Sequence, residues 1–277
     1  LPHSSSDDQR KYRPEEDLEA DRNRDPLLTF ANTCIEAGVA KQEEFDKILI
    51  SVKSQVDADA EWAETQPDPD SNDSLKNVYN SILPKDTTEP SPNSGEKIVL
   101  VDAINHALDE ELAHNDKMMI YGQDVAGGKG GVFTATRGLT DKHGVDRVFN
   151  SPLAESSIIG TAIGLATLGY KPVIEIQFGD YIWYSMMQIR NEVATMCYRS
   201  NGKWSSPIVM RVPVGGYIHG SLCHSQCIDG YFTHLPGIYI AYPSNAADAK
   251  GLLKMACRMD DPVMFMEHKG LYRQGFA

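Results

Sequence analysis

The sequence predicts an α/β fold in which a parallel sheet is flanked by helices and is preceded by a helical segment and a linker. Short apolar runs of strand length recur along the second two thirds of the chain, and stretches with apolar residues at helical spacing lie between them. This alternation is typical of a parallel sheet that is covered on both faces. The expected strands cover residues 118–121, 172–176, 208–212, 238–241 and 263–266. The expected helices of this part cover about 156–168, 180–199 and 245–258.

The N-terminal third of the chain differs in composition from the rest. Residues 1–96 carry 22 Asp and Glu against 10 Lys and Arg, and so hold most of the net charge of −13. Within residues 1–65, apolar side chains at helical spacing predict three helices, one of which Asp25 caps and Pro26 begins. Three amphipathic helices in so short a segment cannot bury their apolar faces alone. We therefore expect them to dock on another structure.

The next segment reads as a linker. Residues 66–96 are rich in Pro, Asp, Asn and Ser, and this composition buries too little apolar surface to order a chain. A helical turn or two near residues 75–83 is the one exception that we expect. Residues 97–277 then form the predicted sheet domain.

Composition also excludes several classes of protein. No apolar run reaches the roughly 18–20 residues that a membrane helix needs, and five scattered Cys do not suit a disulfide framework. The negative charge argues against a nucleic-acid or anionic membrane surface. We expect a soluble, cytoplasmic protein with no nucleic-acid or membrane partner. Because Leu1 opens a polar run, we also expect the chain to begin inside a longer protein.

Glu155 precedes an apolar helix that is rich in Gly and Ala. The small residues of this helix permit close packing. An acidic side chain at a helix N-terminus interacts favourably with the helix dipole, so the spacing alone favours a structural role for this carboxylate.

Two other segments carry polar residues in places suited to a site. Gln177 and Tyr181 follow the expected strand 172–176 at its carboxyl end, where open parallel sheets place their ligands. The segment 219–227 holds two His and two Cys, but their spacing does not suit tetrahedral zinc. A loop His of this kind is a candidate proton donor or oxyanion partner, because imidazole titrates near physiological pH. The glycine-rich run 127–131 lacks the order of a phosphate-binding loop, and we expect it to be flexible.

Taken together, these segments resemble the thiamin-diphosphate-dependent decarboxylating component of 2-oxo-acid dehydrogenase complexes. The resemblance to its beta subunit rests on four segments, GGVFTATRGLTDKHGVDRVFNSPLAE (130–155), EIQFGDYIW (175–183), QIRNEVATMCYRSNG (188–202) and HGSLCHSQ (219–226). Residues 3–70 are similar to the C-terminal end of the alpha subunit, so the resemblance implies fused subunits. EIQFGDY and VFNSPLAE fit the branched-chain (2-oxoisovalerate) type better than the pyruvate type. The implied fold of residues 97–277 is the thiamin-diphosphate pyrimidine-binding domain.

Two parts of the family pattern do not occur in this sequence. The diphosphate- and magnesium-binding signature, Gly-Asp-Gly followed by a distant Asn, is expected in a domain that would precede Leu1. The C-terminal domain of the beta subunit is expected to follow Ala277. We therefore predict no metal ligand within this chain, expect Mg²⁺ to be bound mainly by the missing domain, and expect the chain alone to be inactive.

The resemblance implies a binding role for four residues. Glu155 would bond a pyrimidine nitrogen of thiamin diphosphate and shift the aminopyrimidine to its imino form. The Leu153 carbonyl and the side chain of Gln177 match positions near the aminopyrimidine. Tyr181 matches an aromatic residue beside that ring.

The implied reaction is oxidative decarboxylation of a branched-chain 2-oxo acid, with acyl transfer to a lipoyl group on an acyltransferase partner. His224 and His3 match the beta- and alpha-subunit histidines that serve the transfer step. A homo-oligomer of fused chains is the implied assembly. The alternatives are a transketolase-like synthase with the same domain and a non-catalytic assembly module. The retention of Glu155, Gln177, Tyr181 and His224 argues against the latter.

Overall fold

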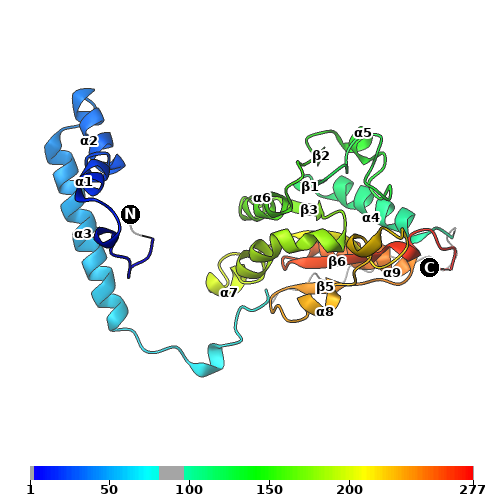
Figure 1. Ribbon diagram of the computed structural model, residues 1–277. Helices are drawn as coiled ribbons and strands as arrows, with labels where there is room; N and C mark the ends of the chain where they lie inside the picture. Colours follow the sequence, from blue (N-terminus) through cyan, green and yellow to red (C-terminus); the bar gives the residue numbers. More distant parts are fainter. Residues whose placement is uncertain (1–2, 81–96, 277) are drawn as a thin grey trace. The chain divides into compact units, whose positions relative to one another are not determined.

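The structure, a computed structural model, describes residues 3–80 and 97–276 and divides into two compact units, Leu1–Ser71 and Asn72–Ala277 (Figure 1). The first unit contains the short 3₁₀ helix η1 (Gln9–Lys11) and the helices α1 (Glu15–Asn23), α2 (Pro26–Glu36) and α3 (Gln42–Glu64). As predicted, Asp25 caps α2 by accepting a hydrogen bond from the backbone N–H of Leu27 at 2.8 Å, and Pro26 is its first residue.

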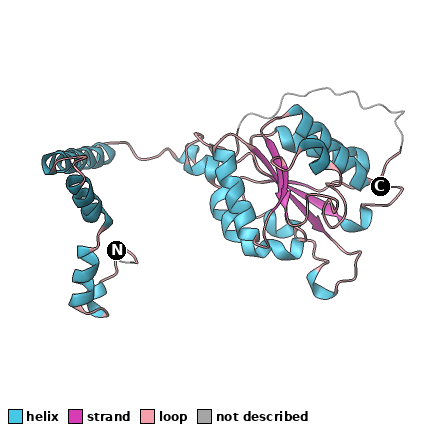
Figure 2. Cartoon of the chain, turned by 90° about the horizontal axis from the view of Figure 1, so that it is seen from above, coloured by secondary structure: helices cyan, strands magenta, loops and turns pink. Residues whose placement is uncertain are grey.

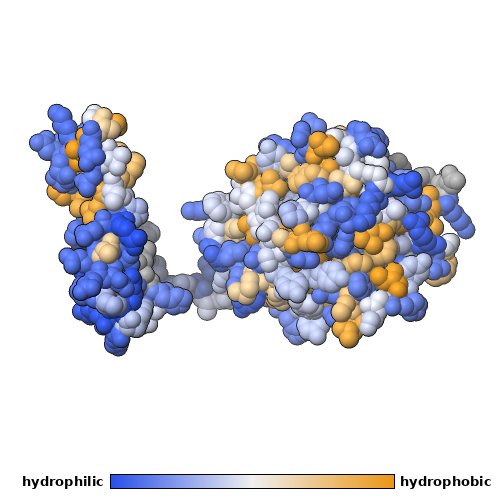
Figure 3. Space-filling model, turned by 45° about the horizontal axis from the view of Figure 1, so that its top comes forward, coloured by the Kyte–Doolittle hydropathy of each residue, from blue (hydrophilic) through white to orange (hydrophobic). Residues whose placement is uncertain are grey.

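The apolar faces of this first unit are largely exposed. Neither α2 nor α3 contains a buried residue, and Leu27 and Leu49 are among their exposed apolar side chains. Figure 3 shows apolar side chains at the surface of both units. The described residues of these helices thus agree with the prediction that they cannot bury their apolar faces alone.

The second unit is built on a six-stranded parallel sheet with the strand order β2-β1-β3-β4-β6-β5. Figure 2 shows this sheet between two layers of helices, which confirms the predicted fold class. The strands are β1 (Met118–Gly122), β2 (Val148–Asn150), β3 (Lys171–Glu175), β4 (Val209–Val214), β5 (Tyr239–Ala241) and β6 (Val263–His268). The larger helices are α4 (Leu100–His114), α6 (Glu155–Thr167) and α9 (Ala246–Arg258). The shorter ones are α5 (Leu139–His143), η3 (Gly179–Ser185), η4 (Gln188–Val193), α7 (Met196–Arg199), η5 (Ser221–Cys223), α8 (Asp229–Phe232) and η6 (Lys269–Leu271). The 3₁₀ helix η2 (Ser71–Asp73) begins at the last residue of the first unit and ends in the second.

Side chains alternate between the two faces of the sheet. Val173 and Val209 pack with α4 and α9 in one apolar cluster, whereas Ile174 and Met210 pack with α6 and η4 in the other. Burial on both faces explains why the strands read as continuous apolar runs.

The structure corrects three details of the predicted elements. The helix expected at 180–199 is divided into the 3₁₀ helix η3, the π-helix η4 and the single α-helical turn α7. The short strand β2 was not predicted, because three residues are too few for a recognisable pattern. Residues 75–79 form turns and bends rather than a helix, and residues 81–83 lie outside the described residues.

Part of the predicted linker is bound to the second unit. The ring of Tyr79 packs on Tyr239 with centroids 4.8 Å apart, and the backbone N–H of Asn80 donates to Asp261 Oδ1 at 2.7 Å. Tyr79 thus contacts β5, an edge strand of the sheet, and Asn80 contacts the turn before β6.

Candidate active site

The carboxyl ends of all six strands lie at one edge of the sheet, because the strands are parallel. Gln177 comes two residues after the end of β3, and His224 lies in the loop after β4. Glu155 begins α6, which follows β2. The fold therefore gathers the predicted site residues of the second unit at the edge where parallel sheets bind ligands.

Glu155 is held by a residue that the sequence analysis did not single out. The Gln123 side-chain amide donates a hydrogen bond to Glu155 Oε1 at 3.1 Å, and Gln123 is only 4% exposed. Glu155 itself is half-buried at the first position of α6, next to the N-cap residue Ala154. The side chain of Leu153 is 84% exposed just before this helix.

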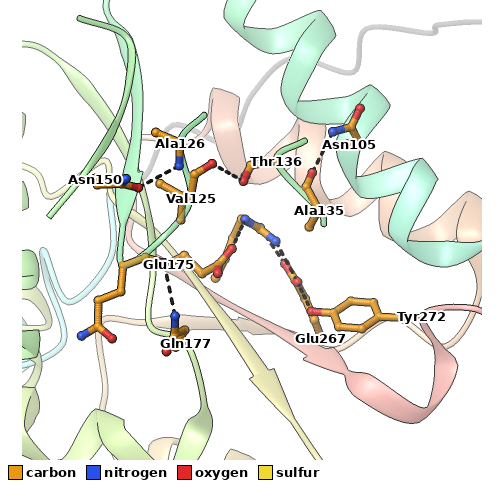
Figure 4. Close-up of polar contacts among 12 residues, drawn as sticks. Asn105, Val125, Ala126, Ala135, Thr136, Asn150, Glu175, Gln177, Glu267 and Tyr272 are labelled. Carbon is orange, nitrogen blue, oxygen red and sulfur yellow. Dashed lines mark hydrogen bonds and ion pairs between the residues drawn. The ribbon is translucent and has the colours of Figure 1, made fainter. Parts of the chain in front are cut away.

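Gln177 is hydrogen-bonded to the two residues that follow β1. Its amide donates to the Gln123 backbone carbonyl at 3.4 Å (Figure 4). It also donates to Asp124 Oδ2 at 3.4 Å. Lys129 also pairs with Asp124, and this hydrogen bond lowers the pKa of the Asp124 carboxyl. The residues after β1 therefore contact both Glu155 and Gln177.

His224 is held by hydrogen bonds at both ring nitrogens. Nδ1 lies 3.0 Å from the Gly220 carbonyl oxygen, and Nε2 lies 2.9 Å from the Tyr181 hydroxyl. A carbonyl can only accept, so Nδ1 carries a proton and donates it. In a neutral ring Nε2 is then the acceptor, and Tyr181 donates. Burial, followed by neighbouring acidic charges, raises the pKa of Tyr181, which favours the protonated hydroxyl that this donation needs.

A short segment after β3 holds the loop that carries His224. The Phe178 ring meets the His224 ring edge-on with centroids 4.7 Å apart, and Asp180 Oδ2 accepts from the Gln226 N–H at 3.4 Å.

Lys269 Nζ lies 5.5 Å from the centroid of the Phe178 ring and is buried with no hydrogen-bond partner among the described residues. Burial lowers the pKa of Lys269 to about 8.

Behind this edge lies a fully buried ionic network. Arg211 donates to Glu175 Oε2 at 2.8 Å and to the two oxygens of Glu267 at 2.7 and 2.9 Å. Tyr272 adds a hydrogen bond to Glu267 Oε2 at 2.5 Å (Figure 4). Burial raises the pKa of Glu175, although Arg211 opposes this shift. Burial disfavours the Arg211 charge, but the neighbouring carboxylates outweigh it and raise the pKa of Arg211.

The loop after β1 covers this network. The Ala126 N–H donates to Asn150 Oδ1 at 2.8 Å, and the Thr136 hydroxyl donates to the Val125 carbonyl at 2.6 Å (Figure 4). Gly131 belongs to this loop, and a Cβ there would lie 3.4 Å from Glu175 Oε1. The glycine-rich run predicted to be a flexible loop thus includes a residue that lies against a buried carboxylate.

His3 belongs to the first unit, where it is exposed and its backbone N–H donates to Asp7 Oδ2 at 3.2 Å. Its association with the residues of the second unit stays a prediction. Within the described ranges, 3–80 and 97–276, no group of three or more His, Cys, Asp or Glu is arranged to hold a metal ion. Cys223 and Cys227 are exposed free thiols. No helix in the described part of the chain is long and apolar enough to cross a bilayer.

Residues 96–274 match the family described as "Transketolase, pyrimidine binding domain", and the chain therefore belongs to this family. Residues 1–72 match "Dehydrogenase E1 component". The resemblance drawn from the sequence is thus confirmed at the level of these families.

Particular relatives are beta subunits of 2-oxo-acid dehydrogenases. The chain is 50% identical over 173 residues to 2-oxoisovalerate dehydrogenase subunit beta of Bacillus subtilis, covering 62% of this chain and 53% of that one. It is 45% identical over 177 residues to pyruvate dehydrogenase E1 component subunit beta of the same organism, covering 64% and 54%. The mitochondrial 2-oxoisovalerate dehydrogenase subunit beta of Dictyostelium discoideum is 46% identical over 184 residues, covering 65% and 49%.

The chain spans about half the length of the curated relatives that it matches. Among solved structures, a chain described as "Split gene transketolase, inactive beta4 tetramer" is 24% identical, with a TM-score of 0.49 over 61% of this chain and 50% of that one.

Proposed function

We propose that this chain supplies the pyrimidine-binding half of the active site of a 2-oxo-acid dehydrogenase decarboxylating component. The observation that carries the proposal is the cluster of Glu155, Gln123 and Gln177 at the carboxyl edge of the sheet. Beta subunits of two 2-oxo-acid dehydrogenases are 50% and 45% identical to this chain over 173 and 177 residues.

The residues present suit an aminopyrimidine ring. Glu155 is half-buried with one carboxylate oxygen already bonded, so its other oxygen can meet a ring nitrogen. The Leu153 carbonyl and Gln177 would meet the polar edge of the ring, and Tyr181 would lie beside its face. When bound, thiamin diphosphate supplies a nucleophilic carbon that attacks the 2-oxo acid and holds the electron pair left as carbon dioxide departs. Mg²⁺ would be held mainly by a domain outside this chain.

Residues of this chain would hold and donate the protons that the reaction requires. Glu155 holds a proton at the ring nitrogen, where partial burial strengthens the hydrogen bond. His224 donates a proton during acyl transfer, and the Tyr181 hydroxyl supports the ring tautomer at Nε2. His3 is proposed as the second proton donor.

We further propose the branched-chain type, fused subunits and acyl transfer to a lipoyl group on an acyltransferase partner. The higher identity to the 2-oxoisovalerate subunit than to the pyruvate subunit of Bacillus subtilis supports the substrate. The matches of residues 1–72 and 96–274 within one chain support the fusion, with residues 1–65 as the alpha-type tail, 66–96 as the linker and 97–277 as the beta-type domain. A homo-oligomer of fused chains and a cytoplasmic location stay predictions.

The test is decarboxylation by the full-length fused protein with thiamin diphosphate, Mg²⁺ and an artificial electron acceptor. We expect turnover of 4-methyl-2-oxopentanoate above that of pyruvate, and its loss in Glu155→Gln. A preference for pyruvate would overturn the branched-chain assignment. Failure to bind thiamin diphosphate would favour a non-catalytic assembly module. The 277-residue chain alone is expected to be inactive, and activity there would contradict that expectation.

A further inference from the structure

Gln123 connects the two polar side chains that the proposed function assigns to the aminopyrimidine. Its side-chain amide donates to Glu155 Oε1 at 3.1 Å, and its backbone carbonyl accepts from Gln177 at 3.4 Å. At 4% exposure, its side chain cannot exchange these contacts freely for water. One residue thus contacts both.

The identity of the donor follows from chemistry. An ionised carboxylate can only accept hydrogen bonds, so the NH₂ group of the Gln123 amide must face Glu155. The bond occupies Oε1, and no other residue in the described part of the chain bonds Oε2. A hydrogen bond at one oxygen also restricts rotation of the carboxylate, which otherwise turns readily about its terminal torsion.

The backbone that carries Gln123 is held firmly. Gly122, the last residue of β1, pairs with β2 on one side and β3 on the other. A Cβ at Gly122 would lie 2.5 Å from the Glu175 carbonyl oxygen, so the strands approach closely at this point. The Ser151 N–H donates to the Gly122 carbonyl at 2.9 Å. A group on such a rigid element can fix the geometry of its neighbour.

We propose that Gln123 is a positioning residue that fixes the Glu155 carboxylate, with Oε1 bound and Oε2 directed to a pyrimidine nitrogen of thiamin diphosphate. The inference rests on the proposed function and deepens it, because it assigns the orientation of Glu155 to a named donor. The group that this role requires is the side-chain amide N–H of Gln123. A side chain of equal size without a hydrogen-bond donor would not fix the carboxylate.

The experiment compares wild type, Gln123→Met, Glu155→Gln and the double variant, each as full-length fused protein with thiamin diphosphate and Mg²⁺. The measurement is the rate at which the thiazolium C2 proton exchanges with deuterium, followed by acid-quench NMR without any 2-oxo acid. A hydrogen bond to a charged group contributes about 1.5–3 kcal/mol. We therefore expect Gln123→Met to slow the exchange at least ~10-fold.

A second readout needs no cofactor. In a crystal structure of cofactor-free Gln123→Met, the Glu155 carboxylate is expected in more than one orientation, whereas wild type shows one. Gln188→Met is the matched control, since Gln188 is a half-buried glutamine of η4 outside this cluster. It is expected to leave both readouts unchanged.

The outcomes separate this proposal from the proposed function. If Gln123 acts through Glu155, Gln123→Met has no additional effect in the Glu155→Gln background. Wild-type exchange in Gln123→Met, or the same slowing in both backgrounds, would overturn the positioning role. If Glu155→Gln itself leaves exchange unchanged, the role of Glu155 in the proposed function fails, and the positioning role fails with it.

Discussion

Arg211 is fully buried between two carboxylates, so Arg211→Met is expected to destabilise the second unit strongly. The change removes three hydrogen bonds to Glu175 and Glu267 and leaves two acidic groups in the sheet without their cation. Removing one partner of a buried ion pair costs about 3–5 kcal/mol in the free energy of unfolding. Since domains are stable by roughly 5–15 kcal/mol, this is a large part of the total.

The cost should depend on pH, with a sign that the structure fixes. Burial raises the pKa of Glu175 above its ordinary value of 4.5, so folding favours its protonated form. This contribution is largest in acid and is lost as the pH rises through the folded-state pKa. In Arg211→Met the cation that opposes the effect of burial is absent, so the pKa of Glu175 rises further. Arg211→Met is therefore expected to cost less at pH 5 than at pH 8.

The assay is urea unfolding followed by tryptophan fluorescence in a Trp62→Phe background, which leaves both remaining tryptophans in the second unit. The control is Arg199→Met, whose partner Glu192 lies 2.9 Å away at the surface and whose loss should cost under about 1 kcal/mol. A cost below about 1 kcal/mol for Arg211→Met, or one that does not vary with pH, would refute the reasoning.

Three other changes test separate parts of the site. Tyr181→Phe removes the donor to His224 Nε2, so the preference of the ring for the Nδ1–H tautomer should fall about fivefold. The ratio of the two tautomers is measured by ¹⁵N NMR of the ring, and an unchanged ratio would contradict the assigned hydrogen bond. Because burial lowers the pKa of Lys269 from 10.5 to about 8, stability should rise between these pH values. Lys269→Met should therefore raise the melting temperature at pH 7 and lose this advantage near pH 10.5, and a loss of stability at pH 7 would exclude this account. Gly130→Ala should lower the free energy of unfolding by over ~3 kcal/mol, because the new Cβ would overlap the Arg137 backbone at a position with positive φ. In the control Gly138→Ala the new Cβ meets no neighbouring atom, so only the positive φ is unfavourable and the cost should be about 1–2 kcal/mol. Both costs are measured by urea unfolding, and equal costs would rule out the overlap.

Five of the six strands and the helices α6 and α9 were predictable, because apolar patterning records burial directly. The helix expected at 156–168 is α6, and the strand expected at 263–266 is the core of β6. The segment 180–199 has the same apolar spacing as a helix. Its tertiary contacts instead bury Ile182 and Ser185 in a 3₁₀ turn and Ile189 in a π-helix, and a pattern of single residues does not contain those contacts.

The resemblance identified the candidate site residues, but the sequence did not show which residues bond to them. Gln123 and Glu155 are 32 positions apart, and Arg211 and Glu267 are 56 apart, so no local spacing joins them. A signal did exist for the second pair, since each is a lone charge within an apolar strand, and a buried charge requires a partner. The identity of that partner depends on strand order, which local patterns do not specify.

The position of β6 between β4 and β5 has a consequence for synthesis of the protein on the ribosome. β6 follows both of its neighbours in the chain, so neither can complete its pairing until residues 263–268 have been made. Arg211 likewise has no Glu267 to bind until translation has advanced 56 residues further. During this interval Arg211 has only Glu175 as an ionic partner, and the growing chain presents an unpaired strand edge, which is the condition under which nascent chains aggregate or bind chaperones.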